Sequence, residues 1–282
     1  MTITSDLFLS ARYCCVLGYP VSHSRSPQIH RLFAEQFGLP LRYEKISVVP
    51  GTLSQAVDAL RVAGCCGINV TVPLKEEAYR LAAASGAPQA AAAHAANTLW
   101  WTAEGVLRAD NTDGTGLCRD LIENHQVVLH DRRILLLGAG GAAAGVIQPL
   151  LEAAPEQLIV SNRTLHRAQA LSARFAAHGP IEWAAADTRF EHPFDLVINA
   201  TSSSITRELP LVDKSAVGAR TVCYDMFYAA TETTFCAWAR DAGAAHCFDG
   251  LGMLIEQAAA AFLIWHGLRP DTVRVLAAMR LG

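Results

Sequence analysis

Short apolar segments alternate with segments of helical periodicity along the first third of the chain. Strands are expected at residues 12–18, 41–48 and 67–70. Helices are expected from Ser26 as cap with Pro27 at the first position, from about Leu53, and from Pro73. Strands alternating with helices favour parallel pairing through right-handed crossovers, so this order predicts a mostly parallel sheet.

A second alternating series follows a helical stretch at residues 114–124. Strands are expected at residues 133–137, 158–161, 181–184, 195–199 and 220–224. Helices are expected after the first two of these strands, one ending near Ala153 and one beginning at Leu165. This order is typical of a nucleotide-binding α/β domain.

The segment from Gly250 to the C-terminus predicts two further helices. The first is apolar on all sides, so we expect it to be buried between two domains. A chain of 282 residues with 51% hydrophobic composition is long enough and apolar enough for two cores.

Charge and composition narrow the expected partners and location. The net charge of −3 leaves no broad basic surface, so nucleic acid is not an expected partner. Residues 134–151 carry no formal charge, but four glycines, Gln148 and Pro149 indicate a strand, a turn and a helix rather than a membrane span. The N-terminus, with Asp6 and no long apolar core, does not resemble a signal peptide, so we expect a cytoplasmic protein with no membrane contact.

The cysteines are expected to be buried free thiols. They lie at Cys14, Cys15, Cys65, Cys66, Cys118, Cys223, Cys236 and Cys247. They form no C-x-x-C pair and have no histidine at zinc-ligand spacing, so no metal site is expected.

A glycine turn indicates a dinucleotide site. The apolar run from Ile134 leads into a G-x-G-x-x-A turn at Gly138, Gly140 and Ala143, and then into a helix. Glycines allow the sharp turn and bring backbone N–H groups to a pyrophosphate at the helix N-terminus. A tight turn that binds no ligand is the alternative.

The end of the next strand favours NADP over NAD. NAD-binding domains usually place an acidic residue there to hold the ribose 2′-hydroxyl. This chain has Ser161, Asn162, Arg163 and Thr164, followed by Arg167. Both arginines can hold a 2′-phosphate through charge-assisted hydrogen bonds, and Arg163 can stack on adenine. Two solvated surface arginines are the alternative.

Two serines at the start of the first helix are candidates for binding a carboxylate. Ser24 and Ser26 offer hydroxyls near free N–H groups at a helix N-terminus, where the dipole favours an anion. Simple capping of the helix is the alternative role for Ser26.

Lys75 and Asp113 are candidates for proton transfer. Lys75 follows Pro73 into the first turn of a helix, where the dipole disfavours a cation, so a functional reason for it is expected. Asp113 precedes the helix that leads into the nucleotide domain, and its carboxylate could hold Lys75 and a substrate hydroxyl. The alternatives are a solvated lysine balanced by Glu76 and Glu77, and helix capping by Asp113.

Several motifs together resemble the shikimate dehydrogenase family along essentially the whole chain. They lie at residues 18–27, 69–75, 96–98, 110–114, 138–142, 162–164, 199–203, 224–228 and 249–257. The resemblance implies two α/β domains. A substrate-binding domain (residues 1–113, completed by 250–282) and a Rossmann NADP-binding domain (114–249) would form the active site in the cleft between them.

The resemblance also implies roles for individual residues. The substrate carboxylate would meet Ser24, Ser26 and Tyr228. Its ring hydroxyls would meet Asn69, Thr71, Lys75, Asn97, Asp113 and Gln257, and Lys75 with Asp113 would be the catalytic pair. NADP would contact Gly138, Ala139, Gly140, Gly141, Ala142, Asn162, Arg163, Thr164, Arg167 and Thr201, with Met226 and Gly250 near the nicotinamide.

The chain departs from the family pattern at three positions. Family members commonly have glycine at the positions of Ala109 and Ser204, and asparagine at that of Arg31. Ser204 lies beside the expected cofactor loop and bears on its backbone shape.

The expected activity is the reversible, NADPH-dependent reduction of 3-dehydroshikimate to shikimate, in the biosynthesis of chorismate and aromatic amino acids. The alternatives are a quinate/shikimate dehydrogenase that prefers NAD or acts on other substrates, and a non-enzymatic regulator that senses shikimate. Intact Lys75 and Asp113 argue against the regulator. Monomer and homodimer are both compatible with the sequence.

Overall fold

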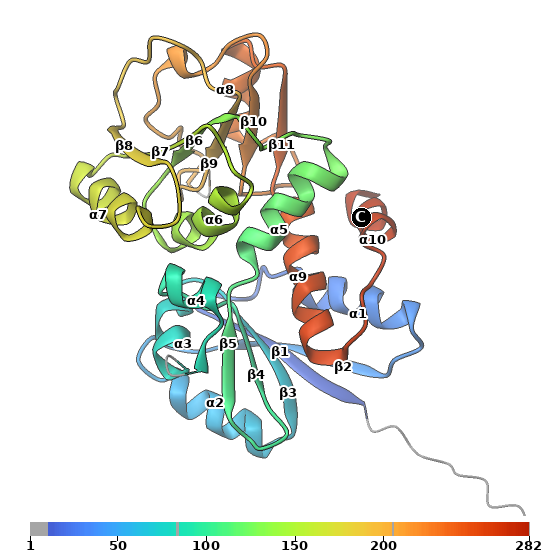
Figure 1. Cartoon of the computed structure of the whole chain (residues 1–282). Helices are drawn as coiled ribbons and strands as arrows, with labels where there is room; N and C mark the ends of the chain where they lie inside the picture. The colour runs from blue at the N-terminus through green and yellow to red at the C-terminus, as the bar shows by residue number, and fades with distance from the viewer. Residues whose placement is uncertain (1–10, 83–84, 205, 282) are drawn as a thin grey trace, which may run out of the picture.

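The protein is represented by a computed structural model that describes residues 11–82, 85–204 and 206–281. The chain folds around two sheets that lie one above the other, with helices α5 (Asp113–Arg119) and α9 (Leu251–His266) running between them (Figure 1). The interpretation of the N-terminus around Asp6 falls outside the described residues.

The first sheet has five strands in the order β2-β1-β3-β4-β5. Strands β1 (Arg12–Gly18), β2 (Leu41–Ser47) and β3 (Cys65–Val70) are parallel, as predicted. Strands β4 (Thr98–Trp101) and β5 (Leu107–Asp110) continue the sheet in antiparallel pairing, so the sheet is mixed.

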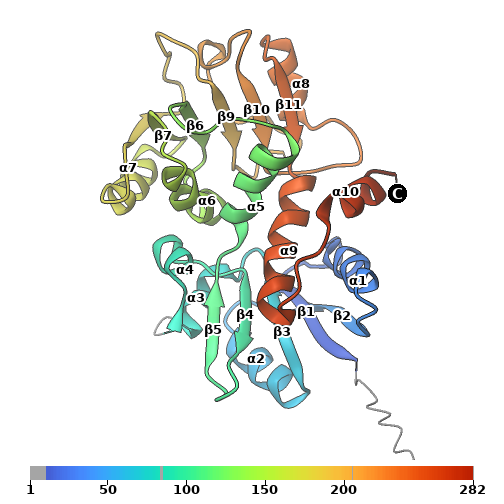
Figure 2. The ribbon, with the colours of Figure 1, turned by 45° about the vertical axis from the view of Figure 1, so that its right-hand side comes forward.

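Helices cover both faces of this first sheet. One face is covered by α2 (Leu53–Val62), α3 (Lys75–Leu81) and α4 (Pro88–Ala93), around a core that includes Leu17, Ile68 and Leu99. On the other face lie α1 (Ser26–Gln36), α9 and α10 (Thr272–Leu281), as Figure 2 shows.

The second sheet has six parallel strands in the order β11-β10-β9-β6-β7-β8. The strands are β6 (Arg133–Leu137), β7 (Gln157–Asn162), β8 (Ile181–Ala185), β9 (Leu196–Asn199), β10 (Val222–Asp225) and β11 (His246–Asp249). The helices around it are α6 (Gly141–Glu152), α7 (Leu165–Phe175) and α8 (Thr234–Asp241), with a 3-10 turn at Lys214–Ala216. The strand order reverses between β6 and β9, and ligands of open α/β sheets bind at such a switch point.

The segments between the sheets were predicted in part. The predicted helix at residues 114–124 is present as α5 followed by a π-helix at Asp120–Asn124. Helix α9 is deeply buried. It packs most extensively against α5, and it also contacts α1 and α10 through residues such as Ile29, Phe33 and Phe262. Met253 of α9 belongs to the core cluster of the second sheet, so the helix lies between the two halves as predicted.

Two helix starts differ from the prediction. The side chain of Ser26 caps nothing; Ser26 is itself the first residue of α1. Helix α3 begins at Lys75 rather than at Pro73, although Lys75 lies in its first turn as expected. Within the described residues no helix is both long and apolar enough to cross a bilayer.

Candidate active site

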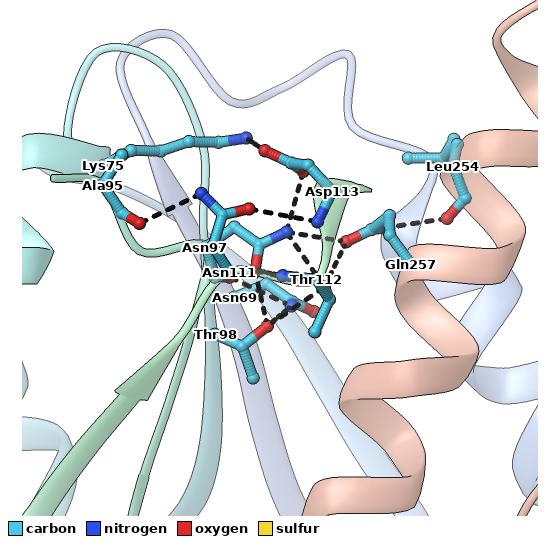
Figure 3. Close-up of polar contacts among 10 residues, drawn as sticks. All are labelled: Asn69, Lys75, Ala95, Asn97, Thr98, Asn111, Thr112, Asp113, Leu254 and Gln257. Carbon is cyan, nitrogen blue, oxygen red and sulfur yellow. Dashed lines mark hydrogen bonds and ion pairs between the residues drawn. The ribbon is translucent and has the colours of Figure 1, made fainter. Parts of the chain in front are cut away.

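Lys75 and Asp113 form an ion pair near the junction of the two halves of the structure (Figure 3). Each is the first residue of its helix, Lys75 of α3 and Asp113 of α5. Lys75 Nζ lies 2.5 Å from Oδ2 of Asp113, and both side chains are largely shielded from solvent. Asp113 makes no capping hydrogen bond, since Thr112 holds the cap position of α5. The ion pair therefore accounts for the lysine that the helix dipole disfavours.

Amide side chains surround the carboxylate of Asp113. The amide of Asn97 donates to Oδ1 of Asp113 at 2.8 Å and lies 3.3 Å from Oε1 of Gln257. The backbone N–H of Thr112 donates to Oδ1 of Asn97 at 2.9 Å, which fixes the orientation of the Asn97 amide. Asn111 positions the start of α5 by accepting from the N–H of Asp113 at 3.1 Å. The network joins β3, β4, α5 and α9 at the carboxyl end of the first sheet (Figure 3).

Asn69 is the next member of this network. Its Oδ1 accepts a 2.7 Å hydrogen bond from the hydroxyl of Tyr43, and its Nδ2 donates to the carbonyl of Asn97 at 3.2 Å. Burial raises the pKa of Tyr43 well above its ordinary value, so the hydroxyl stays protonated and able to donate. The Tyr43 ring stacks on His30, with ring centroids 4.5 Å apart.

The two predicted serines form a pair at the start of α1. The hydroxyl of Ser24 donates to Oγ of Ser26 at 3.2 Å, and the N–H of Ser26 donates to Oγ of Ser24 at 3.3 Å. The nearby Ser26 hydroxyl acts to lower the pKa of Tyr43, although burial outweighs this effect. Tyr43 therefore lies near the serine pair and is hydrogen-bonded to Asn69.

Thr71 and Tyr228 lie nearby but outside this hydrogen-bonded network. Thr71 lies so close to Gly18 that a Cβ at residue 18 would come within 2.5 Å of its methyl group. Tyr228 packs against the cluster formed by α1 and α9, and burial raises the pKa of its hydroxyl while Arg25 opposes the shift.

The glycine turn leads from β6 into α6 at the switch point of the second sheet. Gly138 adopts a left-handed φ of 110°, which an L side chain would disfavour, and its N–H donates to the carbonyl of Ser161 at 2.7 Å. A Cβ at Gly140 or Gly141 would meet nothing within 4 Å, so the N-terminus of α6 is open to a ligand. Ala139, Gly140 and Gly141 line a cleft of about 600 Å³ together with Tyr79 and His94 of the first half.

The end of β7 has the groups that a 2′-phosphate requires. The side-chain amide of Asn162 donates to the carbonyl of Thr164 at 3.0 Å and closes the turn. Arg163 is exposed beside this turn, and Arg167 lines the cleft. An open helix N-terminus and two available guanidinium groups fit a dinucleotide with a 2′-phosphate.

Several hydrogen-bonded polar side chains connect the loops that follow β9 and β10. Oδ1 of Asn199 accepts from the hydroxyl of Thr201 at 2.7 Å, and its amide donates to Oδ1 of Asp225 at 3.1 Å. Ser204 donates to Oδ2 of Asp225 at 2.7 Å, and the N–H of Phe227 donates to Oδ1 of Asp225 at 3.1 Å. Ser204 is one of the departures from the family pattern. Its hydroxyl makes a hydrogen bond to Asp225 that a glycine at this position could not make.

Met226 and Gly250 lie side by side at the end of β10. A Cβ at residue 250 would collide with the carbonyl oxygen of Met226, and the N–H of Gly250 donates to the carbonyl of Phe227. Only glycine allows this approach of the two backbones.

Comparisons with known proteins identify the family. Residues 16–99 match the shikimate dehydrogenase substrate binding domain, residues 120–221 the shikimate / quinate 5-dehydrogenase family, and residues 250–280 the shikimate 5'-dehydrogenase C-terminal domain. The chain belongs to the shikimate dehydrogenase family.

Relatives of this shikimate dehydrogenase family member match it over nearly their full length. The shikimate dehydrogenase (NADP(+)) of Hahella chejuensis is 46% identical, covering 95% of this chain and 98% of its own. An Ael1 enzyme from Pseudomonas putida is 38% identical with a TM-score of 0.89, covering 95% and 98%. Shikimate 5-dehydrogenase from Thermus thermophilus, solved with NADP(H) and shikimate, is 32% identical with a TM-score of 0.85, covering 96% and 99%.

The structure gathers most of the residues that the family resemblance nominates. Lys75, Asn69, Asn97, Asp113 and Gln257 form one network, and the glycine turn opens into the cleft beside it. Sequence reasoning missed Tyr43, Thr112, Asn199 and Asp225, which hold other site residues in place. Asn199 and Asp225 are polar residues at the ends of predicted strands, and this position could have indicated their role. Tyr43 lies within a β-strand pattern and carried no such signal.

Proposed function

We propose that the protein is an NADP-dependent shikimate dehydrogenase, which reversibly reduces 3-dehydroshikimate to shikimate in the biosynthesis of chorismate and aromatic amino acids. The observation that carries this proposal is the Lys75–Asp113 ion pair, set in an amide network beside an open dinucleotide turn. The name shared by the relatives, shikimate dehydrogenase (NADP(+)), supports both the substrate and the cofactor.

The cofactor would be held by the second sheet. Residues Gly138 to Ala142 would receive the pyrophosphate at the N-terminus of α6, and Asn162, Arg163, Thr164 and Arg167 would hold the adenosine 2′-phosphate. Thr201, Met226 and Gly250 would lie near the nicotinamide. NADPH, when bound, supplies the hydride for the ketone carbon.

The substrate would be held by the first sheet. Ser24, Ser26 and Tyr228 offer hydroxyls for a carboxylate. Asn69, Thr71, Asn97 and Gln257 offer amides and a hydroxyl for ring hydroxyls. Tyr43, which lies near Ser26, holds the side chain of Asn69 by a hydrogen bond, so the two ends of this pocket share one supporting residue. A rigid pocket of this kind orients the substrate for reaction.

Lys75 and Asp113 would carry out the proton transfer. In the direction of reduction, protonated Lys75 supplies a proton to the forming alkoxide or orients the group that does so. Asp113 holds the ammonium group by charge and is itself held by the amide of Asn97, so both side chains keep one orientation. In the direction of oxidation the same pair accepts the proton from the substrate hydroxyl or orients the group that accepts it.

Several further assignments belong to this proposal. Residues 1–113 with 250–282 would be the substrate-binding domain and residues 114–249 the NADP-binding domain. The protein would act in the cytoplasm as a monomer or homodimer, without a nucleic-acid partner.

A spectrophotometric assay tests the proposed function. Purified protein is incubated with shikimate and NADP, and the formation of NADPH is followed by its absorbance. Quinate and NAD replace shikimate and NADP in parallel reactions. Turnover with shikimate and NADP that exceeds every other combination supports the proposal. A preference for NAD contradicts the role of Arg163, and no turnover with any combination leaves a ligand-binding regulator as the better interpretation.

A further inference from the structure

Two pairs of cysteines face each other across the central strands of the first sheet. Sγ of Cys14 lies 3.5 Å from Sγ of Cys66, and Sγ of Cys15 lies 3.9 Å from Sγ of Cys65. All four are free thiols. Cys14 and Cys66 lie on the face covered by α9, where Trp265 packs, whereas Cys15 and Cys65 lie in the core under α2 and α3.

A bulge brings Cys14 and Cys66 onto the same face. Along β1 and β3, Tyr13 is paired with Cys65 but Cys14 is paired with Gly67, so Cys66 has no partner in the ladder. Neighbouring strands lie about 4.8 Å apart, which is within the range of Cα separations that disulfides span, roughly 4.4–6.8 Å. The two sulfurs need to approach from 3.5 Å to about 2.05 Å to bond.

The two cysteine pairs differ in their exposure to solvent and in the charged side chains that lie near them. Cys66 is partly exposed, and the hydrogen bond from Cys14 lowers its pKa, with the nearby Arg12 guanidinium acting in the same direction. Cys15 and Cys65 are both buried. Their mutual hydrogen bond raises the pKa of Cys15 and lowers that of Cys65, and the nearby Glu44 carboxylate opposes ionisation of both thiols. A thiolate that solvent reaches is the form that reacts with an oxidant, so Cys66 is the favoured point of attack.

We propose that Cys14 and Cys66 are a dithiol modification site, which a two-electron oxidant such as hydrogen peroxide converts into a disulfide. The Cys66 thiolate attacks one peroxide oxygen and releases hydroxide, which leaves a sulfenic acid on Cys66. Sγ of Cys14 then attacks the Cys66 sulfur, and the hydroxyl group leaves as water with the Cys14 proton. Two thiols lose two hydrogen atoms, and the peroxide is reduced to two waters.

The site lies on the strands that carry the proposed substrate residues. Strand β1 leads at its carboxyl end to the segment of Ser24 and Ser26, and β3 ends at Asn69 and Val70. The bond would therefore join the two central strands of the sheet, which lie side by side in Figures 1 and 2.

Peptide mapping after peroxide treatment tests the proposal. The protein is treated with hydrogen peroxide, remaining thiols are alkylated, and the tryptic digest is examined by mass spectrometry. Trypsin releases residues 13–25 and 62–75, and each of these peptides carries two of the four cysteines. The expected product is a single linked pair of these peptides, lighter than their sum by two hydrogen atoms and absent after dithiothreitol. Tandem fragmentation of this wild-type product assigns the bond to two of the four sulfurs without any variant.

Matched variants identify the pair independently. The linked product is expected to persist in Cys15→Ser and Cys65→Ser and to disappear in Cys14→Ser and Cys66→Ser. Cys118 is the internal control: burial raises its pKa to about 12, so it should escape oxidation and be recovered in alkylated form once the treated protein is unfolded for alkylation. A link that survives in Cys66→Ser, a link between Cys236 and Cys247 alone, or oxidation of Cys66 to a sulfinic acid without a link would overturn the proposal.

Discussion

The hydroxyl of Tyr43 on β2 donates a 2.7 Å hydrogen bond to Oδ1 of Asn69 on β3, which lies two strands away in the first sheet. This bond holds the Asn69 amide in one orientation. Tyr43→Phe removes the hydroxyl and keeps the ring on His30. A hydrogen bond contributes about 0.5–1.5 kcal/mol, so we expect the KM for shikimate to rise roughly 2- to 12-fold while the KM for NADP stays the same.

Tyr13→Phe is the matched control for this effect. Tyr13 is also a strand tyrosine of the first sheet, but its hydroxyl donates to Glu44 at 3.0 Å, away from the polar network. Steady-state kinetics of both variants should change only for Tyr43→Phe. Equal changes in both variants, or a change in the KM for NADP, would show that Tyr43 acts through general stability rather than through Asn69.

Lys75→Ala should greatly reduce turnover without unfolding the protein. The lysine bonds to Asp113, and proton transfer by a positioned group contributes about 10²- to 10⁴-fold to a rate, so kcat should fall by about that factor. NADP binding, measured by the quenching of tryptophan fluorescence, should be nearly unchanged. Lys214→Ala, on the 3-10 turn of the second sheet, is the control and should keep full activity. Near-normal turnover of Lys75→Ala would refute its catalytic role.

Arg163→Ala should weaken the preference for NADP. A hydrogen bond to a charged group contributes about 1.5–3 kcal/mol, so the KM for NADP should rise roughly 10- to 150-fold, with little change in the KM for NAD. Arg220→Ala provides the comparison, because Arg220 is also exposed but precedes β10, at the opposite end of the sheet. If both cofactors lose affinity equally, the residue does not recognise the 2′-phosphate.

His30 should make the stability of the protein depend on pH. Burial lowers the pKa of His30 to about 3, with His266 acting in the same direction, whereas an unfolded histidine titrates near 6.5. The unfolded chain therefore binds more protons between these values, so stability falls as pH falls below about 6.5 and the loss is complete near pH 3. The contribution of this one group between pH 7 and pH 5 is about 2 kcal/mol.

Urea unfolding at pH 7 and pH 5 measures this loss. His30→Phe keeps an aromatic ring against Tyr43 and Trp265 but has no group to protonate. Its free energy of unfolding should therefore depend less on pH than that of the wild type by about 2 kcal/mol. Identical pH dependence in the two proteins would mean that His30 is accessible to protons in the folded state.

The sequence predicted the parallel parts of the fold well and the antiparallel additions poorly. Strands β1 and β6 have long apolar runs, and their predicted bounds match the structure. The antiparallel strands β4 and β5 were missed, as was β11, a parallel strand at the edge of the second sheet. All three are short, and β5 and β11 carry charged or polar side chains within them. Such strands form because a neighbouring strand offers hydrogen bonds, which a local pattern does not record.

Site residues could be predicted from the sequence where a residue type is unusual for its place in the fold. One example is Lys75 at a helix N-terminus, and another is the pair of arginines at the place where NAD-binding domains have an acidic residue. Each indicated a ligand or a charged partner. Tyr43 and Thr112 conflict with nothing locally, because their roles come from side chains that the fold brings to them from other elements.

The glycines of α5 and α6 bear on how the acid–base pair behaves when the two halves of the protein move. A Cβ at Gly114 would come within 2.5 Å of the Pro149 ring, and a Cβ at Gly145 within 3.3 Å of the Asp113 carboxylate, so the two helices touch without intervening side chains. Asp113 thus contacts the helix proposed to hold the cofactor, while Lys75 and Asn97 hold the same carboxylate to the first sheet. The acid–base pair therefore lies at the pivot between the halves, where a rotation of one half against the other displaces the cofactor turn more than it displaces the pair.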